Sequence, residues 1–138
     1  MNKKNLFARD DPYLFNNLAN AEEGKEDWSS ALEHFTYASK LDSSFEAPAL
    51  GRALVLYQIG QDNESLQYFK NLQGKYPNYT DGNAILAMMI QDTNKEEAKA
   101  LWAEVVKQDE RYGDIDWIRN IRRWPPRLVL LLEKFTQA

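Results

Sequence analysis

The chain has 138 residues, 43% of them hydrophobic and 28% charged, as expected for one folded domain and not for a disordered or membrane-spanning protein. The absence of cysteine excludes disulfide bonds and thiol chemistry, and it fits a reducing, cytoplasmic compartment. The net charge of −4 is uneven, because residues 111–138 carry six basic and three acidic side chains (+3), which leaves −7 for residues 1–110.

Helix breakers and hydrophobic spacing predict a chain of helices. Residues 1–10 are polar and are expected to be a flexible N-terminus. Asp11-Pro12 then indicates a helix start, because Asp caps free N–H groups and Pro has no N–H to leave unbonded. No apolar run approaches the roughly 20 residues that span a bilayer, so no transmembrane segment is expected. The predicted helices cover residues 12–23, 28–41, 46–59, 63–74, 81–91 and 95–108.

Small and aromatic residues recur along these helices at a fixed interval. Ala19, Ala53 and Ala87 are equally spaced along the chain, and the same interval separates Phe35 from Phe69. A period of this length, about 34 residues, is the main sequence sign of stacked helical repeats. The residues that match are Phe15, Leu18, Ala19, Ala31, Phe35 and Ala38 in the first unit, Ala53, Leu56, Gly60, Ser65, Phe69, Leu72 and Pro77 in the second, and Leu86, Ala87, Ile90, Ala98, Trp102 and Val105 in the third.

With these residues in this order, residues 11–112 resemble the tetratricopeptide repeat (TPR) family. The resemblance implies an all-α solenoid of three TPR-like helix pairs, with first helices that line a concave groove for a protein ligand. Four positions depart from the family pattern, and one of them is Asn94, which stands where the second unit has Gly60. Arg52 replaces a usual Leu and is expected to find a carboxylate partner or to expose its head on a buried stem. Glu22 replaces a large apolar residue, and Gly24 comes early enough to distort the first turn.

Residues 113–138 leave the repeat and are expected to form a helical cap. One helix is predicted from Ile115 to Arg123, and Pro125-Pro126 ends it. Residues 127–135 (RLVLLLEKF) predict a second helix that is apolar on nearly all sides and is therefore buried. Because the end of a repeat array exposes an apolar face, a covering role is expected. The alternative is that the last helix lies in the groove and competes with partners.

The tail sequence DWIRNIRRWPP, followed by an apolar helix, resembles the ending of small TPR proteins from cyanobacteria and chloroplasts. This resemblance implies an accessory or assembly role. It also implies a stromal or thylakoid-associated location in place of a cytoplasmic one.

The TPR resemblance places eight residues of the first helices in the protein-binding groove. Their apolar middle and polar rim suit an amphipathic helix or an extended apolar peptide. The alternative is ordinary packing beneath the C-terminal helix, because periodicity does not separate a core stripe from a groove. The Lys and Arg of a carboxylate clamp are missing, so a chaperone tail is not expected as the ligand. The groove residues are Tyr13, Asn16, Asn20, Leu50, Leu54, Tyr57, Ala84 and Met88.

A basic cluster beside Trp117 and Trp124 is a second candidate site. Arginine and aromatic side chains together can hold single-stranded nucleic acid, and the charge also suits anionic lipid. The cluster is small and the whole chain is acidic, so pairing with Asp114, Asp116 and the acidic body is the simpler expectation. The cluster consists of Arg119, Arg122, Arg123 and Arg127.

Enzymatic chemistry has little support in the sequence. His34 is the only histidine and is expected to face outward, and no set of convergent ligands or acid–base groups accompanies it. No metal or cofactor is therefore expected. The favoured function is a non-enzymatic adaptor or assembly factor, and the alternative is a structural subunit docked permanently in a larger complex. The identity of the partner and the oligomeric state do not follow from the sequence.

Overall fold

A computed structural model of the chain describes residues 11–137. All regular structure in this range is helical, as the hydrophobic spacing predicts, and no strand occurs among the described residues. The flexibility expected of residues 1–10 concerns residues outside this range. Contacts divide the chain into two compact units, Met1–Ile59 and Gly60–Ala138, and each unit is described by itself.

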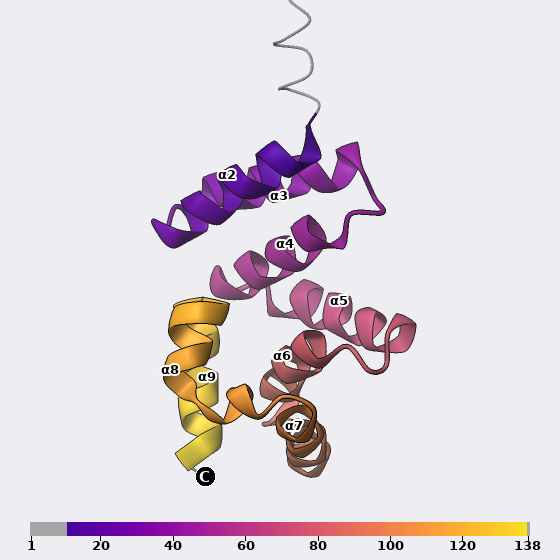
Figure 1. Cartoon of the computed structure of the whole chain (residues 1–138), viewed down its shortest axis with the longest axis vertical. Helices are drawn as coiled ribbons and strands as arrows, with labels where there is room; N and C mark the ends of the chain where they lie inside the picture. The colour runs from indigo at the N-terminus through magenta and orange to yellow at the C-terminus, as the bar shows by residue number, and fades with distance from the viewer. Residues whose placement is uncertain (1–10, 138) are drawn as a thin grey trace, which may run out of the picture. The chain divides into compact units, whose positions relative to one another are not determined.

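Three helices make up the described part of the first unit. The second helix packs against both of the others, and the first two run side by side (Figure 1). Asp11 begins the first helix as predicted, because its Oδ1 accepts hydrogen bonds from the backbone N–H groups of Tyr13 (2.9 Å) and Leu14 (3.4 Å). The helices are α2 (Pro12–Gly24), α3 (Trp28–Leu41) and α4 (Glu46–Gln58).

Phe35 is the centre of the first unit's core. It is 1% exposed and packs in one cluster with Ala19, Ala31 and Val55. A methyl group added at Gly51 would lie only 2.5 Å from the Phe35 ring. Because Gly51 has no side chain, α4 approaches α3 closely enough to close over this ring.

The first interhelix turn is regular, contrary to the expectation drawn from Gly24. Glu26 has a φ of 61°, and Gly60, one repeat later in the sequence, has a φ of 95°. Both turns therefore use a left-handed residue at the same place in the repeat. Arg52 is half-buried, and its Nε donates to the hydroxyl of Thr36 at 3.2 Å.

The second unit contains the remaining helices. Within it α5 packs on α6, and α6 packs on both α7 and α9. The elements are α5 (Asp62–Lys75), α6 (Thr80–Ile90), α7 (Lys95–Gln108), the 3-10 helix η1 (Glu110–Gly113), α8 (Ile115–Trp117), the π-helix η2 (Ile118–Arg122) and α9 (Pro126–Gln137).

Helix length and burial both follow the sequence period. The helices α3, α5 and α7 each have 14 residues. The start of α5 lies one full repeat after the start of α3, and α7 begins one position earlier than a further full repeat would place it. The third unit is one residue shorter because α6 has 11 residues where α2 and α4 have 13, although the turn after α6 is one residue longer than the other two turns. In that turn Asn94 caps α7 by accepting from the backbone N–H of Glu97 at 3.2 Å. The small residues Ala31, Ser65 and Ala98 recur at intervals of 34 and 33 residues, each with 0% exposure.

The segments that link one helix pair to the next also repeat. The residues after α3, α5 and α7 are extended, and each donates its N–H to a carbonyl four residues earlier. Three residues further on stand Phe45, Tyr79 and Tyr112, whose N–H groups bond back over 3.1–3.2 Å. Tyr112 is thus the third member of an aromatic series that the sequence matching overlooked.

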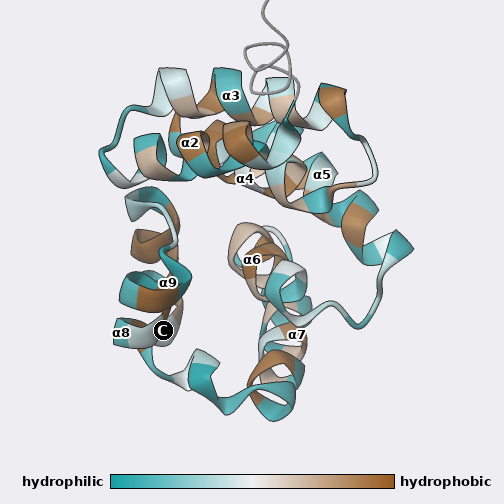
Figure 2. Ribbon diagram, turned by 45° about the horizontal axis from the view of Figure 1, so that its top comes forward, coloured by the Kyte–Doolittle hydropathy of each residue, from teal (hydrophilic) through white to brown (hydrophobic). Residues whose placement is uncertain are grey.

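The two C-terminal helix predictions need correction. The helix expected from Ile115 to Arg123 is one α-helical turn followed by the π-helix η2, and Arg123 ends it with a φ of 57°. The last helix is amphipathic rather than apolar on all sides, as the hydropathy colours of α9 indicate (Figure 2). Leu132 is 1% exposed whereas Leu130 is 63% exposed. The reason is spacing, because Arg127, Leu130 and Lys134 recur every three to four residues on one outward stripe.

Candidate functional site

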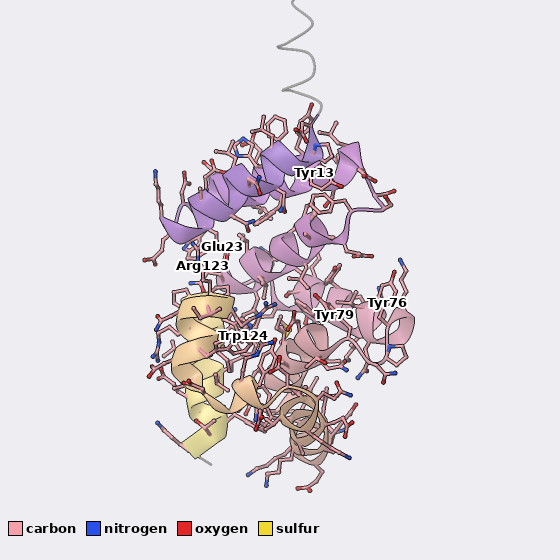
Figure 3. All side chains as sticks on the ribbon, viewed as in Figure 1. Tyr13, Glu23, Tyr76, Tyr79, Arg123 and Trp124 are labelled. Carbon is pink, nitrogen blue, oxygen red and sulfur yellow. The ribbon has the colours of Figure 1, made fainter. Side chains whose placement is uncertain are left out.

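The predicted groove residues of the first unit differ in accessibility. Tyr13 is 59% exposed and projects from the start of α2 (Figure 3). Its ring lies 4.5 Å from that of Phe45, and this contact ties the start of α2 to the start of α4. Asn20 is exposed and Leu50 is half-buried. The three buried members of the set are Asn16, Leu54 and Tyr57.

Asn16 has an unusual environment for a polar side chain. It is 8% exposed, and among the described residues its Oδ1 has no hydrogen-bond partner. A buried acceptor without a donor costs about 1–3 kcal/mol. Such a group is uncommon in folded proteins and is one of the features associated with a binding function. Asn16 therefore does not stabilise α2 through this atom.

The groove residues of the second unit lie on a helix that is already covered. Ala84 and Met88 of α6 are both 0% exposed, and α9 packs on α6. At the end of α6, Gln91 donates from its Nε2 to the carbonyl of Leu131 at 3.0 Å. In this unit the predicted positions are packing residues, which was the alternative left open by their spacing.

A second set of polar contacts fixes the C-terminal segment to the start of α6. Asp81 accepts a hydrogen bond from the hydroxyl of Tyr112 and forms a 2.5 Å ion pair with Arg122. Tyr112 is 1% exposed, and its ring meets that of Trp117 edge-on at 5.1 Å. Burial raises the pKa of the Tyr112 hydroxyl far above its ordinary value, and the hydrogen bond to Asp81 raises it further. Tyr112 therefore remains a protonated donor.

The predicted basic cluster is largely neutralised by carboxylates. Arg119 bonds to Asp116 at 3.0 Å and to Glu133 at 3.1 Å, so the expected pairing with Asp116 is confirmed. The guanidinium of Arg127 donates to both carboxylate oxygens of Asp62, and the contact to Oδ2 is 2.8 Å. Arg122, through Asp81, and Arg127, through Asp62, therefore tie the C-terminal segment to other parts of the second unit, whereas Arg119 pairs within the segment. The fourth, Arg123, is the exposed left-handed residue after η2.

Asp114 does not pair with the arginine cluster as the sequence suggested. Its Oδ1 accepts from the backbone N–H groups of Asp116 (3.0 Å) and Trp117 (3.3 Å). It is therefore the N-cap of α8, a use of Asp that competes with pairing to a distant arginine.

No family model, curated protein or solved structure matches this chain. Function must therefore be argued from the geometry of the two units. Within the described range, no helix has the length and apolar character needed to cross a membrane.

His34 does not face outward as expected. Its Nδ1 lies 2.6 Å from Oε1 of Glu22, and its ring stacks on Phe15 at 5.8 Å. Glu22, which departs from the repeat pattern, thus joins α2 to α3 through a polar pair. Across residues 11–137, no three potential metal ligands of the His, Cys, Asp and Glu types gather at one place.

A pocket of about 430 Å³ lies in the second unit. Its walls come from α5, α6 and the start of α7, and its charged groups are Lys70 and Glu97. No nucleophile–base pair is formed by the residues that line it, so it offers no recognisable catalytic arrangement. The lining residues are Lys70, Gln73, Leu86, Ile90, Thr93, Asn94 and Glu97.

Proposed function

We propose that the chain is a non-enzymatic, TPR-like adaptor that binds a short segment of a partner protein along α2 and α4. The observation that supports this proposal most strongly is that whole structural features recur at the interval of the sequence repeat. Helix starts, buried small residues and extended linkers recur at about this interval in all three units, and the left-handed turn recurs in the first two. Repeats of this kind commonly present one row of helices to a ligand.

The accessible groove residues define the kind of ligand. Tyr13 and Leu50 offer apolar contact, and Asn20 offers an amide that can pair with a peptide backbone. Asn16 adds an acceptor that has no partner within the described chain. A short extended peptide with one apolar anchor satisfies these groups best, because its backbone N–H groups can serve the amides while its side chain meets Tyr13.

Differential capture from the native host lysate tests this proposal. The bait proteins are the intact chain, Tyr13→Ala, Asn16→Leu and the control Tyr76→Ala. Tyr76 is 44% exposed but lies in the second unit, at the end of α5 (Figure 3). We expect the same protein to be lost from Tyr13→Ala and Asn16→Leu but retained by Tyr76→Ala. Partners that are indifferent to both groove substitutions would contradict the proposal.

A permanently docked structural subunit is the second candidate. The observation that favours it is the pair of exposed aliphatic side chains in the C-terminal segment, Ile121 (66%) and Leu130 (63%). Exposed apolar patches of docked subunits promote self-association when the partner is missing. Sedimentation of the purified chain over a range of concentrations separates the two functions, since an adaptor is expected to remain monomeric.

Within the adaptor class, the resemblance of the tail to photosynthetic TPR proteins favours an assembly factor. Binding to RNA or anionic lipid is not proposed, because three of the four arginines that suggested it already have carboxylate partners. Nucleic-acid contacts of this type need free cationic groups at the phosphates.

A further inference from the structure

We infer a second docking surface, on the outer face of α2, for an amphipathic helix with a basic exposed side. This outer face consists of Leu14, Leu18 and Ala21, which are spaced to lie on one side of the helix. Leu14 is 45% exposed and Leu18 is 41% exposed. Isolated exposed leucines are ordinary, but two on one stripe of a helix form a contiguous apolar strip.

On α4, the residues at the equivalent positions pack against a neighbouring helix. The residues one repeat later than Leu14, Leu18 and Ala21 are Pro48, Arg52 and Val55. Pro48 and Val55 are fully buried, and Val55 belongs to the cluster around Phe35 of α3. Arg52 donates to Thr36, which is also on α3. On α4, therefore, this face is covered by the second helix of the preceding pair.

The same arrangement recurs on α6. A methyl group at Gly82, which corresponds to Pro48, would lie 3.0 Å from Leu72 of α5. Leu86, which corresponds to Arg52, is 2% exposed. One face of the first helix thus receives a preceding helix in both later pairs. On α2, the first described helix, the corresponding face is exposed.

The side chains on α2 specify the shape of the occupant. Where α4 has Gly51 beneath the Phe35 ring, α2 has the exposed residue Asn17. The larger side chain prevents so close an approach, so a ring at the centre of the incoming helix would not fit. Aliphatic side chains at intervals of three to four residues would instead meet Leu14 and Leu18.

The net charge of the first unit indicates which side chains would flank the apolar stripe of the occupant. Residues 1–59, which make up the first unit, contain nine acidic and six basic side chains and have a net charge of −3. A helix with lysines on its exposed side is attracted to this unit, whereas the same unit of a second copy would bring −3 against −3. The proposed occupant is therefore a basic helix of another protein and not a second copy of this chain.

Two synthetic peptides test this inference with the full chain. Both carry the same leucine stripe at helical spacing, and they differ only in having lysine or glutamate at the outward positions. We expect the lysine peptide to bind at least about tenfold more tightly at low salt, and the Leu14→Ser/Leu18→Ser variant to lose about tenfold of that affinity. Leu130→Ser is the matched control, because it removes an equally exposed leucine from α9 in the second unit.

Three results would overturn the inference. The first is equal binding of the lysine peptide to the intact chain and to the Leu14→Ser/Leu18→Ser variant, or no binding to either. The second is concentration-dependent self-association that disappears in this variant, which would assign the surface to a second copy. The third is peptide binding that develops only after Leu6→Ser/Phe7→Ser, which replaces the two large apolar residues among positions 2–10 of the sequence and would assign the surface to the chain's own N-terminal segment. A retained circular-dichroism spectrum shows that each variant is folded.

Discussion

Gly51 shows how a single missing side chain sets the spacing of two helices. A methyl group there would meet the Phe35 ring at 2.5 Å, and this ring is itself held by the surrounding cluster. We therefore expect Gly51→Ala to lower the free energy of unfolding by about 1–3 kcal/mol. Gly74→Ala is the control, because nothing lies within 4 Å of that site and helical Ala gains roughly 0.5–1 kcal/mol over Gly. Urea denaturation in which the free energy of unfolding changed in the same direction in both variants would contradict this packing.

Glu26 and Gly60 allow a reciprocal test of the repeated turn. A left-handed conformation is costly for Glu but not for Gly, so Glu26→Gly should raise the free energy of unfolding by up to about 1 kcal/mol. Gly60→Ala should lower it by about 1 kcal/mol, for the opposite reason. No atom lies within 4 Å of a methyl group added at Gly60, so the loss of stability in Gly60→Ala would come from backbone conformation alone. Thermal denaturation of both variants is the measurement, and stabilisation by Gly60→Ala would refute the left-handed turn.

At the scale of elements, α9 packs against the rest of the second unit through one face and exposes the other. Leu132 is 1% exposed and Leu130 is 63% exposed on the same helix. We expect Leu132→Ala to destabilise the chain by about 2–5 kcal/mol, because it opens a cavity against the rest of the second unit. Leu130→Ala should change stability by less than about 0.5 kcal/mol. Equal losses in chemical denaturation would mean that α9 is not docked by the Leu132 side.

The attachment of the C-terminal segment through Tyr112 has a pH signature. The hydroxyl stays protonated in the folded chain, whereas in the unfolded chain it ionises near its ordinary pKa of 10.0. Above that pH the unfolded state loses a proton that the folded state keeps, so the stability from this group falls as pH rises. Below it, the group adds no pH dependence.

The measurement is urea denaturation of the intact chain and Tyr112→Phe at about pH 8 and about pH 10.5. At the lower pH the variant should be less stable by about 1.5–3 kcal/mol, the usual size for a hydrogen bond to a charged group. The difference should shrink at the higher pH. A difference that grew with pH would show that Tyr112 ionises more readily in the folded chain.

The helices of the repeat could be predicted closely because their signals are local. Asp11-Pro12 and the spacing of alanines and aromatic residues predicted ends within one residue for six helices of the described chain. The C-terminal segment could not be predicted so well. The π-helix at η2 and the left-handed Arg123 depend on tertiary contacts such as the Arg122–Asp81 pair, which lie 41 residues apart.

At the scale of the whole molecule, the candidate groove was only partly predictable. The TPR resemblance led us to expect Tyr13 and Asn20 in a groove, and both are accessible on α2, but it did not distinguish them from Ala84 and Met88, which are buried in the second unit. Exposure depends on the neighbours of a helix, and α9 becomes a neighbour of α6 only in the folded chain. The partners of Arg122 and Arg127 were missed for the same reason, since Asp81 and Asp62 are distant from them in sequence.

Hydrogen–deuterium exchange of the chain, with and without the captured partner, tests groove binding most directly. Binding along the proposed groove should slow exchange in α2 and α4 together, with little change in α9, and Asn16→Leu should abolish this protection. Protection of α2 without α4 would instead point to the outer face around Leu14 and Leu18. Protection confined to α8, η2 and α9 would contradict the adaptor proposal and favour docking through the C-terminal segment.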